Sequence, residues 1–521
     1  MNPKRIFVQQ IKPQKEVLNA LKGKNHKDFK RKICKDHTHK DKNEKISKRK
    51  KPDINAKKQD KNIYNIFNDD TKVKSIIQKN KSVIPNFLFL FMIIFIISEI
   101  NTNSQSISLL SYSYKIKITI KQSGSHRILF TGSDPGVCES ITYSPNNINI
   151  NNNDIPNSET VYSTGIYDFS RTDNIVEISW NSPITSFDCL FNNCSEIEEI
   201  DFSDYDTTDI INMKAMFKDC SSLTSIKFGS FITSNVEEMS YMFGGCSKLK
   251  ELDLSILNTQ KLTNMRIMFG GCSSVESLDL SYLDTSTVVD MGYLFYQCSS
   301  LKSINLKGLF NTQEVTSMEN MFSGCSALDS LDLSGFNVNN VINMNHMFEN
   351  CSSFTFLDLS GFITTSVEDL SFMFYGCSSL TSIIISNFKS EKVRTLRSMF
   401  NSCSSLTSLD LSHFNPNNLF DMAFLFLGCR KLTYVNIDNL ETSNVWSMDW
   451  LFAGCSSLTS IKVSHFITSK VEHMEYMFSE CVLITSLDLS NFDTSSCSQF
   501  QGMFNHCSSL TSLRHGYTLR I

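Results

Sequence analysis

Residues 325–350 read CSALDSLDLSGFNVNNVINMNHMFEN, and variants of this stretch follow one another along the C-terminal two thirds of the 521-residue chain. Thirteen of the 17 cysteines mark the variants, at intervals of 26 residues eleven times and 27 residues once. The thirteen are Cys194, Cys220, Cys246, Cys272, Cys298, Cys325, Cys351, Cys377, Cys403, Cys429, Cys455, Cys481 and Cys507. This spacing predicts a solenoid, because one such unit cannot bury its apolar face unless its neighbours stack on it.

The repeat also sets where the phenylalanines and methionines lie. A phenylalanine precedes each of the thirteen cysteines by three residues, from Phe191 to Phe504, and 18 of the 20 methionines fall in two columns. Aligned on cysteine, the unit reads C-S-S-L-T-S-L-D-L-S-x-F-x-T-S-x-V-x-x-M-x-x-M-F-x-x. The low Gly and Pro content excludes a collagen-like fibre, and the 41% apolar content excludes a fully disordered chain.

The two halves of each unit have different apolar periodicities. Apolar and polar residues alternate in the first half, as in Leu331-Asp332-Leu333, which is typical of a strand with its leucines facing inward. In the second half, Val236, Met239, Met242 and Phe243 have the spacing of one face of a short helix. We therefore expect one strand and one short helix in each coil.

Residues that suit the two ends of a helix flank this second half. Ser234 with Glu237 matches a capping box, and Gly245, directly before Cys246, suits a left-handed helix end. The predicted fold class is an α/β solenoid of about 13 coils over residues 184–513.

The L-x-x-L-x-L core and the Met-Phe-x-x-Cys end of the unit resemble the 26-residue leucine-rich repeat of the bacterial-surface-protein (BspA-like) type. The resemblance covers residues ~184–513. It implies an extracellular module, often on lipid-anchored or wall-anchored surface proteins, with a role in adhesion or host interaction. It brings no catalytic residues to this chain. The chain departs from the family in lacking a cysteine after its hydrophobic segment and in carrying a long basic head.

Charge divides the chain into two parts. Residues 1–81 hold 25 Lys and Arg against 9 Asp and Glu, a net charge of +16, whereas the remaining residues carry −20. We expect residues 1–81 to be a disordered basic tail. Its run Lys48-Arg49-Lys50-Lys51 could act as a nuclear import signal or bind nucleic acid or anionic lipid, although we expect no nucleic-acid partner.

Residues 83–97, VIPNFLFLFMIIFII, are the one long apolar stretch of the chain. The stretch is shorter than a typical span of about 20 residues, so we interpret residues 82–100 as a signal-anchor or a signal peptide. Lys79 and Lys81 on its N-terminal side favour a cytoplasmic tail and extracellular repeats. The expected location is a single-pass membrane protein, or a secreted protein if the segment is cleaved. A buried core helix is the other interpretation.

Two short regions flank the array. Residues 101–183 contain alternating segments such as Ile175-Val176-Glu177-Ile178-Ser179-Trp180, and we expect an N-terminal β cap there, since the first coil needs a cover. Residues 514–521 depart from the repeat at Arg514, and we expect them to fray.

The cysteine and aspartate columns are the candidates for chemistry. We interpret the cysteines as buried thiols that act as small apolar residues. Histidines form no column beside them, and a cysteine nucleophile needs a base, so we expect no enzyme, and no cofactor or metal. Acidic residues occupy seven of the thirteen positions on the outward side of the predicted strand. They are Asp201, Asp253, Asp279, Asp332, Asp358, Asp410 and Asp488.

This acidic column has two interpretations, a solvated sheet face or a partner-binding surface. For binding we single out Asp253, Asp279, Asp332, Asp358 and Asp410, together with the apolar interruptions Phe356, Ile384 and Tyr434. The predicted function is a cell-surface protein that binds an unknown protein or glycan through its sheet face. The alternative is an intracellular leucine-rich-repeat scaffold whose basic tail binds nucleic acid or lipid.

Overall fold

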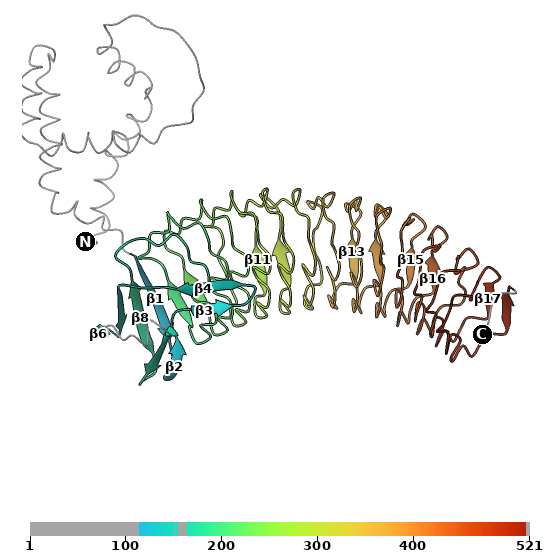
Figure 1. The fold of residues 1–521 in the computed structure, drawn as a ribbon, viewed down its shortest axis with the longest axis horizontal. Helices are drawn as coiled ribbons and strands as arrows, with labels where there is room; N and C mark the ends of the chain where they lie inside the picture. The colour runs from blue at the N-terminus through green and yellow to red at the C-terminus, as the bar shows by residue number, and fades with distance from the viewer. Residues whose placement is uncertain (1–113, 152, 155–163, 517–521) are drawn as a thin grey trace, which may run out of the picture. The chain divides into compact units, whose positions relative to one another are not determined.

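The computed structural model describes residues 114–151, 153–154 and 164–516 (Figure 1). The predicted basic tail, the apolar segment 83–97 and residues 517–521 lie outside the described residues. Within the described ranges there is no helix with the length and apolar character that crossing a membrane requires.

Short parallel strands, at most one to a coil, line one side of the repeat array. They are β9 (Glu199–Asp201), β10 (Ser225–Lys227), β11 (Ser277–Asp279), β12 (Ser303–Asn305), β13 (Phe356–Asp358), β14 (Ser382–Ile384), β15 (Ser408–Asp410), β16 (Tyr434–Asn436), β17 (Ser486–Leu489) and β18 (Ser512–His515). Equivalent residues pair, as Leu278 with Ile304. Leu278 is buried while Ser277 and Asp279 are exposed, so the predicted strand with inward leucines is confirmed.

A second ladder joins the coils in the middle of the repeat. Twelve isolated parallel bridges connect equivalent residues without a gap, from Ser186 with Asn212 to His473 with Gln499. The repeats therefore form a β-solenoid of about 12 turns with a period of about 26 residues, and its strands follow one another in chain order (Figure 1).

The predicted short helix in each coil is wrong, because the described residues contain no helix. Between Met213 and Cys220 the backbone forms tight turns, in which the Met216 N–H donates to the Met213 carbonyl three residues back. Ala215, at φ 50°, and Asp219, at φ 59°, are left-handed and interrupt any helix.

The reason lies in where the backbone hydrogen bonds go. The N–H groups of Met213, Ala215 and Phe217 donate to carbonyls of the following coil, at 2.7 to 2.9 Å. An α-helix would use all its interior N–H groups internally, so it cannot form this ladder. The predicted capping box fails for the same reason, since the Glu237 N–H donates to the Ile211 carbonyl of the preceding coil. The left-handed conformation expected at Gly245 is present, at φ 76°.

The apolar columns stack inside the coils. Each column phenylalanine ring lies 5.3 to 6.1 Å from the next, from Phe191 to Phe504. One apolar core runs without a break from Ile116 to Met503. The cysteine column is buried beside it from Cys194 to Cys481.

Antiparallel strands precede the array. They are β1 (Lys115–Ile120), β2 (Gly124–Arg127), β3 (Thr131–Asp134), β4 (Cys138–Thr142), β5 (Asn147–Ile150), β6 (Asn153–Asp154), β7 (Ile166–Phe169) and β8 (Asn174–Ser179). Four of them share a sheet of order β10-β9-β1-β8-β5-β6 with the strands of the first coils, and β1 is antiparallel to β9. β2 pairs with β7, and β3 pairs with β4, in two separate two-stranded sheets. At the other end β18 continues to His515, so Arg514, where we expected fraying to begin, still pairs with Asp488.

Candidate functional site

The five aspartates predicted to bind a partner lie exposed at the ends of their strands or in the equivalent position of a neighbouring coil. In each, Oδ1 accepts the backbone N–H of the serine two residues later, at 2.8 to 3.1 Å. The acceptors are Asp253, Asp279, Asp332, Asp358 and Asp410. These carboxylates therefore form Asx-turns at the ends of the strands or at the equivalent positions. This structural role is separate from any binding of a partner.

Hydrogen bonding to serine lowers the pKa of all five carboxyl groups. The effect is largest at Asp332, whose pKa falls to about 2, since Lys307 also lies 3.3 Å from its second oxygen. The column is thus ionised at neutral pH. Asp-Leu-Ser recurs at all five positions, and this Asp-x-Ser signal in the sequence could have revealed the turns.

The three apolar interruptions lie exposed on the same strands but not all side by side. Phe356 is 49% exposed, Ile384 38% and Tyr434 56%. The register places Phe356 opposite Ser382 and Ile384 opposite Asp358, so these two apolar residues lie on adjacent strands. Tyr434 is opposite Ser408 on the next pair, two strands beyond Ile384. We call these outward side chains of the strands the strand face.

A second surface, the turn face, is formed by the residues between the two methionine columns and those just before each cysteine. It was missed in the sequence because the consensus leaves these positions as x. In each coil one residue between the two methionine columns has a left-handed backbone, and many of these residues are aromatic or histidine. They are Cys189, Ala215, Tyr241, Ile267, Tyr293, Asn320, His346, Phe372, Ser398, Phe424, Trp450, Tyr476 and Gly502.

Rings and charged groups pair along the turn face. The His346 and Phe372 rings stack at 4.5 Å, and Trp450 and Tyr476 stack at 4.3 Å. The Arg397 guanidinium lies 4.8 Å from the centre of the Phe424 ring, a cation–π arrangement. These contacts join neighbouring coils on the outside of the array.

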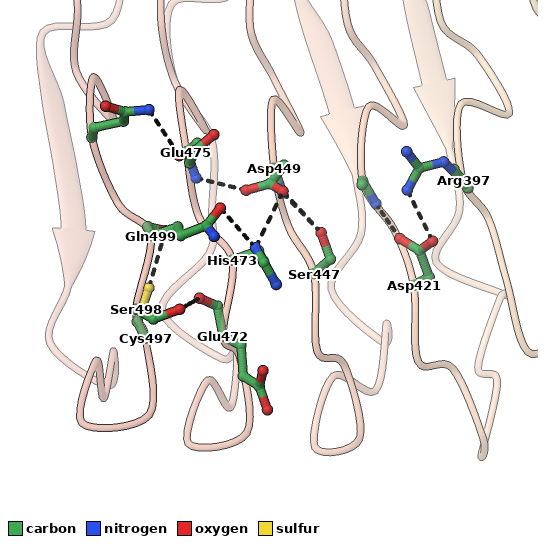
Figure 2. Close-up of polar contacts among 12 residues, drawn as sticks. Arg397, Asp421, Ser447, Asp449, Glu472, His473, Glu475, Cys497, Ser498 and Gln499 are labelled. Atoms are coloured by element: carbon green, nitrogen blue, oxygen red, sulfur yellow. Dashed lines mark hydrogen bonds and ion pairs between the residues drawn. The ribbon is translucent and has the colours of Figure 1, made fainter.

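Figure 2 shows the second ladder beside this face. Arg397 lies 3.2 Å from Asp421, whose side chain is buried. Asp449 accepts the backbone N–H of Glu475, and burial raises the pKa of its carboxyl group. His473 Nδ1 lies 3.1 Å from the Gln499 amide oxygen. Adjacent coils are therefore joined by side chains as well as by backbone bridges.

A disulfide ties the pair of strands β3 and β4 to the array. Cys138 of β4 is bonded to Cys189, and their Cα atoms are 6.3 Å apart. Asp188 lies beside them, and these three residues are the one group in the described part of the chain with the spacing of a metal site. Sulfurs bonded to each other cannot act as thiolate ligands, so the pair fits a disulfide better than a metal.

A model of one protein family matches the repeat array in four overlapping segments, residues 185–308, 271–359, 355–435 and 421–518. The segments together cover more than half of the chain. No curated protein matches the chain, and no solved structure matches it. The chain belongs to the family described as Mycoplasma protein of unknown function, DUF285.

Proposed function

We propose that this protein is a cell-surface leucine-rich-repeat protein of the BspA-like type, which mediates adhesion or protein–protein interaction through its solenoid. The observation that carries the proposal is the exposure of Phe356, Ile384 and Tyr434, at 49%, 38% and 56%, on a strand face that is mostly polar. Exposed aromatic side chains are common anchors of binding energy at interfaces. The acidic column around them would favour a partner with a basic surface.

The extracellular location has independent support. The disulfide between Cys138 and Cys189 is typical of an oxidising compartment. The apolar segment 83–97 with lysines on its N-terminal side would direct the repeats outside, as a single-pass anchor or, if it is cleaved, as a secreted protein.

Protease treatment of intact cells tests the location. We expect added protease to remove the repeats while a cytosolic marker stays intact, and full protection of the repeats would contradict the proposal. N-terminal sequencing of the mature protein then decides between an anchor, which keeps residue 1, and a cleaved signal, which begins after residue 97.

The alternative is an intracellular scaffold whose basic tail binds nucleic acid or anionic lipid. The net charge of +16 over residues 1–81 favours it. A fluorescent fusion that lacks residues 83–97 discriminates, because unchanged localisation supports the scaffold and loss of surface delivery supports the surface protein.

A further inference from the structure

A small pocket lies on the turn face where three successive coils meet. Its volume is about 260 Å³, and its walls include Tyr293 and Tyr296 from one coil, Asn320 and Ser323 from the next, and His346 and Glu349 from the third. Pockets for drug-sized ligands typically measure roughly 300–1,000 Å³, so this one suits a smaller molecule.

Three polar side chains in this pocket have hydrogen-bonding groups without a protein partner among the described residues. Asn345 Oδ1 is buried and accepts no hydrogen bond there. Asn320 is 6% exposed and Ser323 is 2% exposed, and within the described residues neither side chain forms a hydrogen bond, although solvent still reaches their polar atoms. Buried polar side chains are nearly always hydrogen-bonded, because burying one without a partner costs about 1–3 kcal/mol. An amide and a hydroxyl together offer donors and acceptors, so they match a ligand with hydroxyl groups.

The charged groups around the pocket already have partners. Glu319 accepts the Tyr293 hydroxyl at 3.1 Å and lies 3.4 Å from the Arg266 guanidinium. Glu349 lies 2.6 Å from His346 Nδ1. A cationic ligand, such as a lysine or arginine side chain, would compete with Arg266 and His346 for these carboxylates. The arrangement therefore favours a neutral ligand.

Aromatic rings supply the apolar wall. Tyr296 is 36% exposed at the rim, and its ring lies edge-on to Tyr293 at 5.3 Å. An exposed ring face packs well against the C–H face of a flat saturated ring, while unpaired amide and hydroxyl groups bind hydroxyls at its edge. We propose that this pocket binds a single hexose ring, either as a free sugar or as the terminal residue of a glycan.

Saturation-transfer NMR on the full chain tests the inference. The ligands are methyl glycosides of glucose, galactose and mannose, and N-acetylglucosamine, and any detergent used must lack a sugar headgroup. We expect at least one hexose to bind. Tyr296→Ala and Asn320→Gly should each weaken binding tenfold or more. Glycine suits the left-handed backbone of Asn320, at φ 55°, so this change removes the amide without strain.

Tyr375→Ala is the matched control, since Tyr375 occupies the repeat position of Tyr296, two residues before a column cysteine, and does not line the pocket. It should bind as the parent does, and all variants should keep the parent's thermal unfolding midpoint. If Asn320→Gly does not fold, the exposed Tyr296 carries the test.

A glycan array separates the two sources. Binding of a monosaccharide without binding of any arrayed glycan identifies a site for a free sugar, and binding to arrayed glycans that end in a hexose, lost in Tyr296→Ala, identifies a glycan terminus. The inference is overturned if no sugar binds in either format, if Tyr375→Ala loses binding as Tyr296→Ala does, or if an oligolysine peptide binds the pocket instead. Sugar binding in this pocket does not depend on the strand face or on the cellular location of the protein. The sugar-binding inference and the proposed function can therefore fail independently.

Discussion

The thiol of Cys351 donates a hydrogen bond to the backbone carbonyl oxygen of Phe322 in the preceding coil, at 3.1 Å. The same carbonyl accepts the N–H of Cys325 at 3.0 Å. Each column cysteine from Cys220 to Cys507 makes the equivalent bond to a phenylalanine one coil earlier, at 3.0 to 3.3 Å. The thiols are thus polar links between coils as well as small apolar residues.

Burial of the thiols predicts a loss of stability at high pH. It raises the pKa of Cys272, Cys377 and Cys429 from 9.0 to about 12. Between pH 9 and pH 12 the unfolded chain releases these protons while the folded chain keeps them, so stability falls as pH rises, by about 1.4 kcal/mol per thiol for each pH unit at most.

Urea unfolding at pH 7 to 11 measures this effect. Replacing the three cysteines Cys272, Cys377 and Cys429 by alanine should make the fall above pH 9 shallower, because fewer thiols then titrate. An equal slope in the parent and the triple variant would show that other groups cause the alkaline loss.

Truncation of the phenylalanine column should be costly. Phe295 and Phe348 are fully buried between stacked rings. Phe295→Ala or Phe348→Ala should lower the free energy of unfolding by about 3–5 kcal/mol, since each leaves a cavity in the core. Tyr434→Ala, on the exposed strand face, is the control and should change stability by less than about 0.5 kcal/mol. A change within error at both phenylalanines would contradict the stacked core.

The strand half of the repeat could be predicted from the sequence because alternating leucines share one face only when the backbone is extended. The sequence could not distinguish a short helix from the tight turns that form in its place. Val236, Met239, Met242 and Phe243 face the core equally well in either structure. Hydrogen bonds between coils, which are not local in sequence, decide between the helix and the turns. Tyr241 is left-handed, at φ 59°, and its N–H donates to Arg266 in the next coil, a bond that no local propensity encodes.

The sequence predicted some parts of the candidate sites and missed others. The exposure of residues such as Phe356 follows directly from the period of two along a strand. The turn-face pocket at Asn320 depends on side chains from three coils, which a consensus hides. The pairing of Cys138 with Cys189 had no spacing signal, because Cys138 lies outside the repeat and Cys189 outside the cysteine column.

The strand-face aspartates allow charge and structure to be tested separately. Asn305 and Asn436 occupy the aspartate position in two coils. Each accepts the backbone N–H of the residue two positions later, at 3.2 Å. Changing Asp253, Asp279, Asp332, Asp358 and Asp410 together to asparagine should therefore keep the urea midpoint within a small shift, whereas the five alanine changes should lower it clearly. If a basic partner uses this face, the asparagine variant should lose binding to it without losing stability. Equal midpoints for the asparagine and alanine variants would mean that the turns contribute nothing.

Reduction of the disulfide should loosen the first coils selectively. The bond between Cys138 and Cys189 spans 51 residues, and a loop of this size stabilises the folded state by roughly 2–4 kcal/mol, chiefly by restricting the unfolded chain. Hydrogen exchange should then become faster in β1 and β9 when Cys138 and Cys189 are both changed to serine, while β15 and β16 keep their protection. Cys497→Ala is the control, because Cys497 is a half-buried free thiol near the other end of the array. Uniformly faster exchange from β9 to β18 would instead mean that the coils unfold as one cooperative unit.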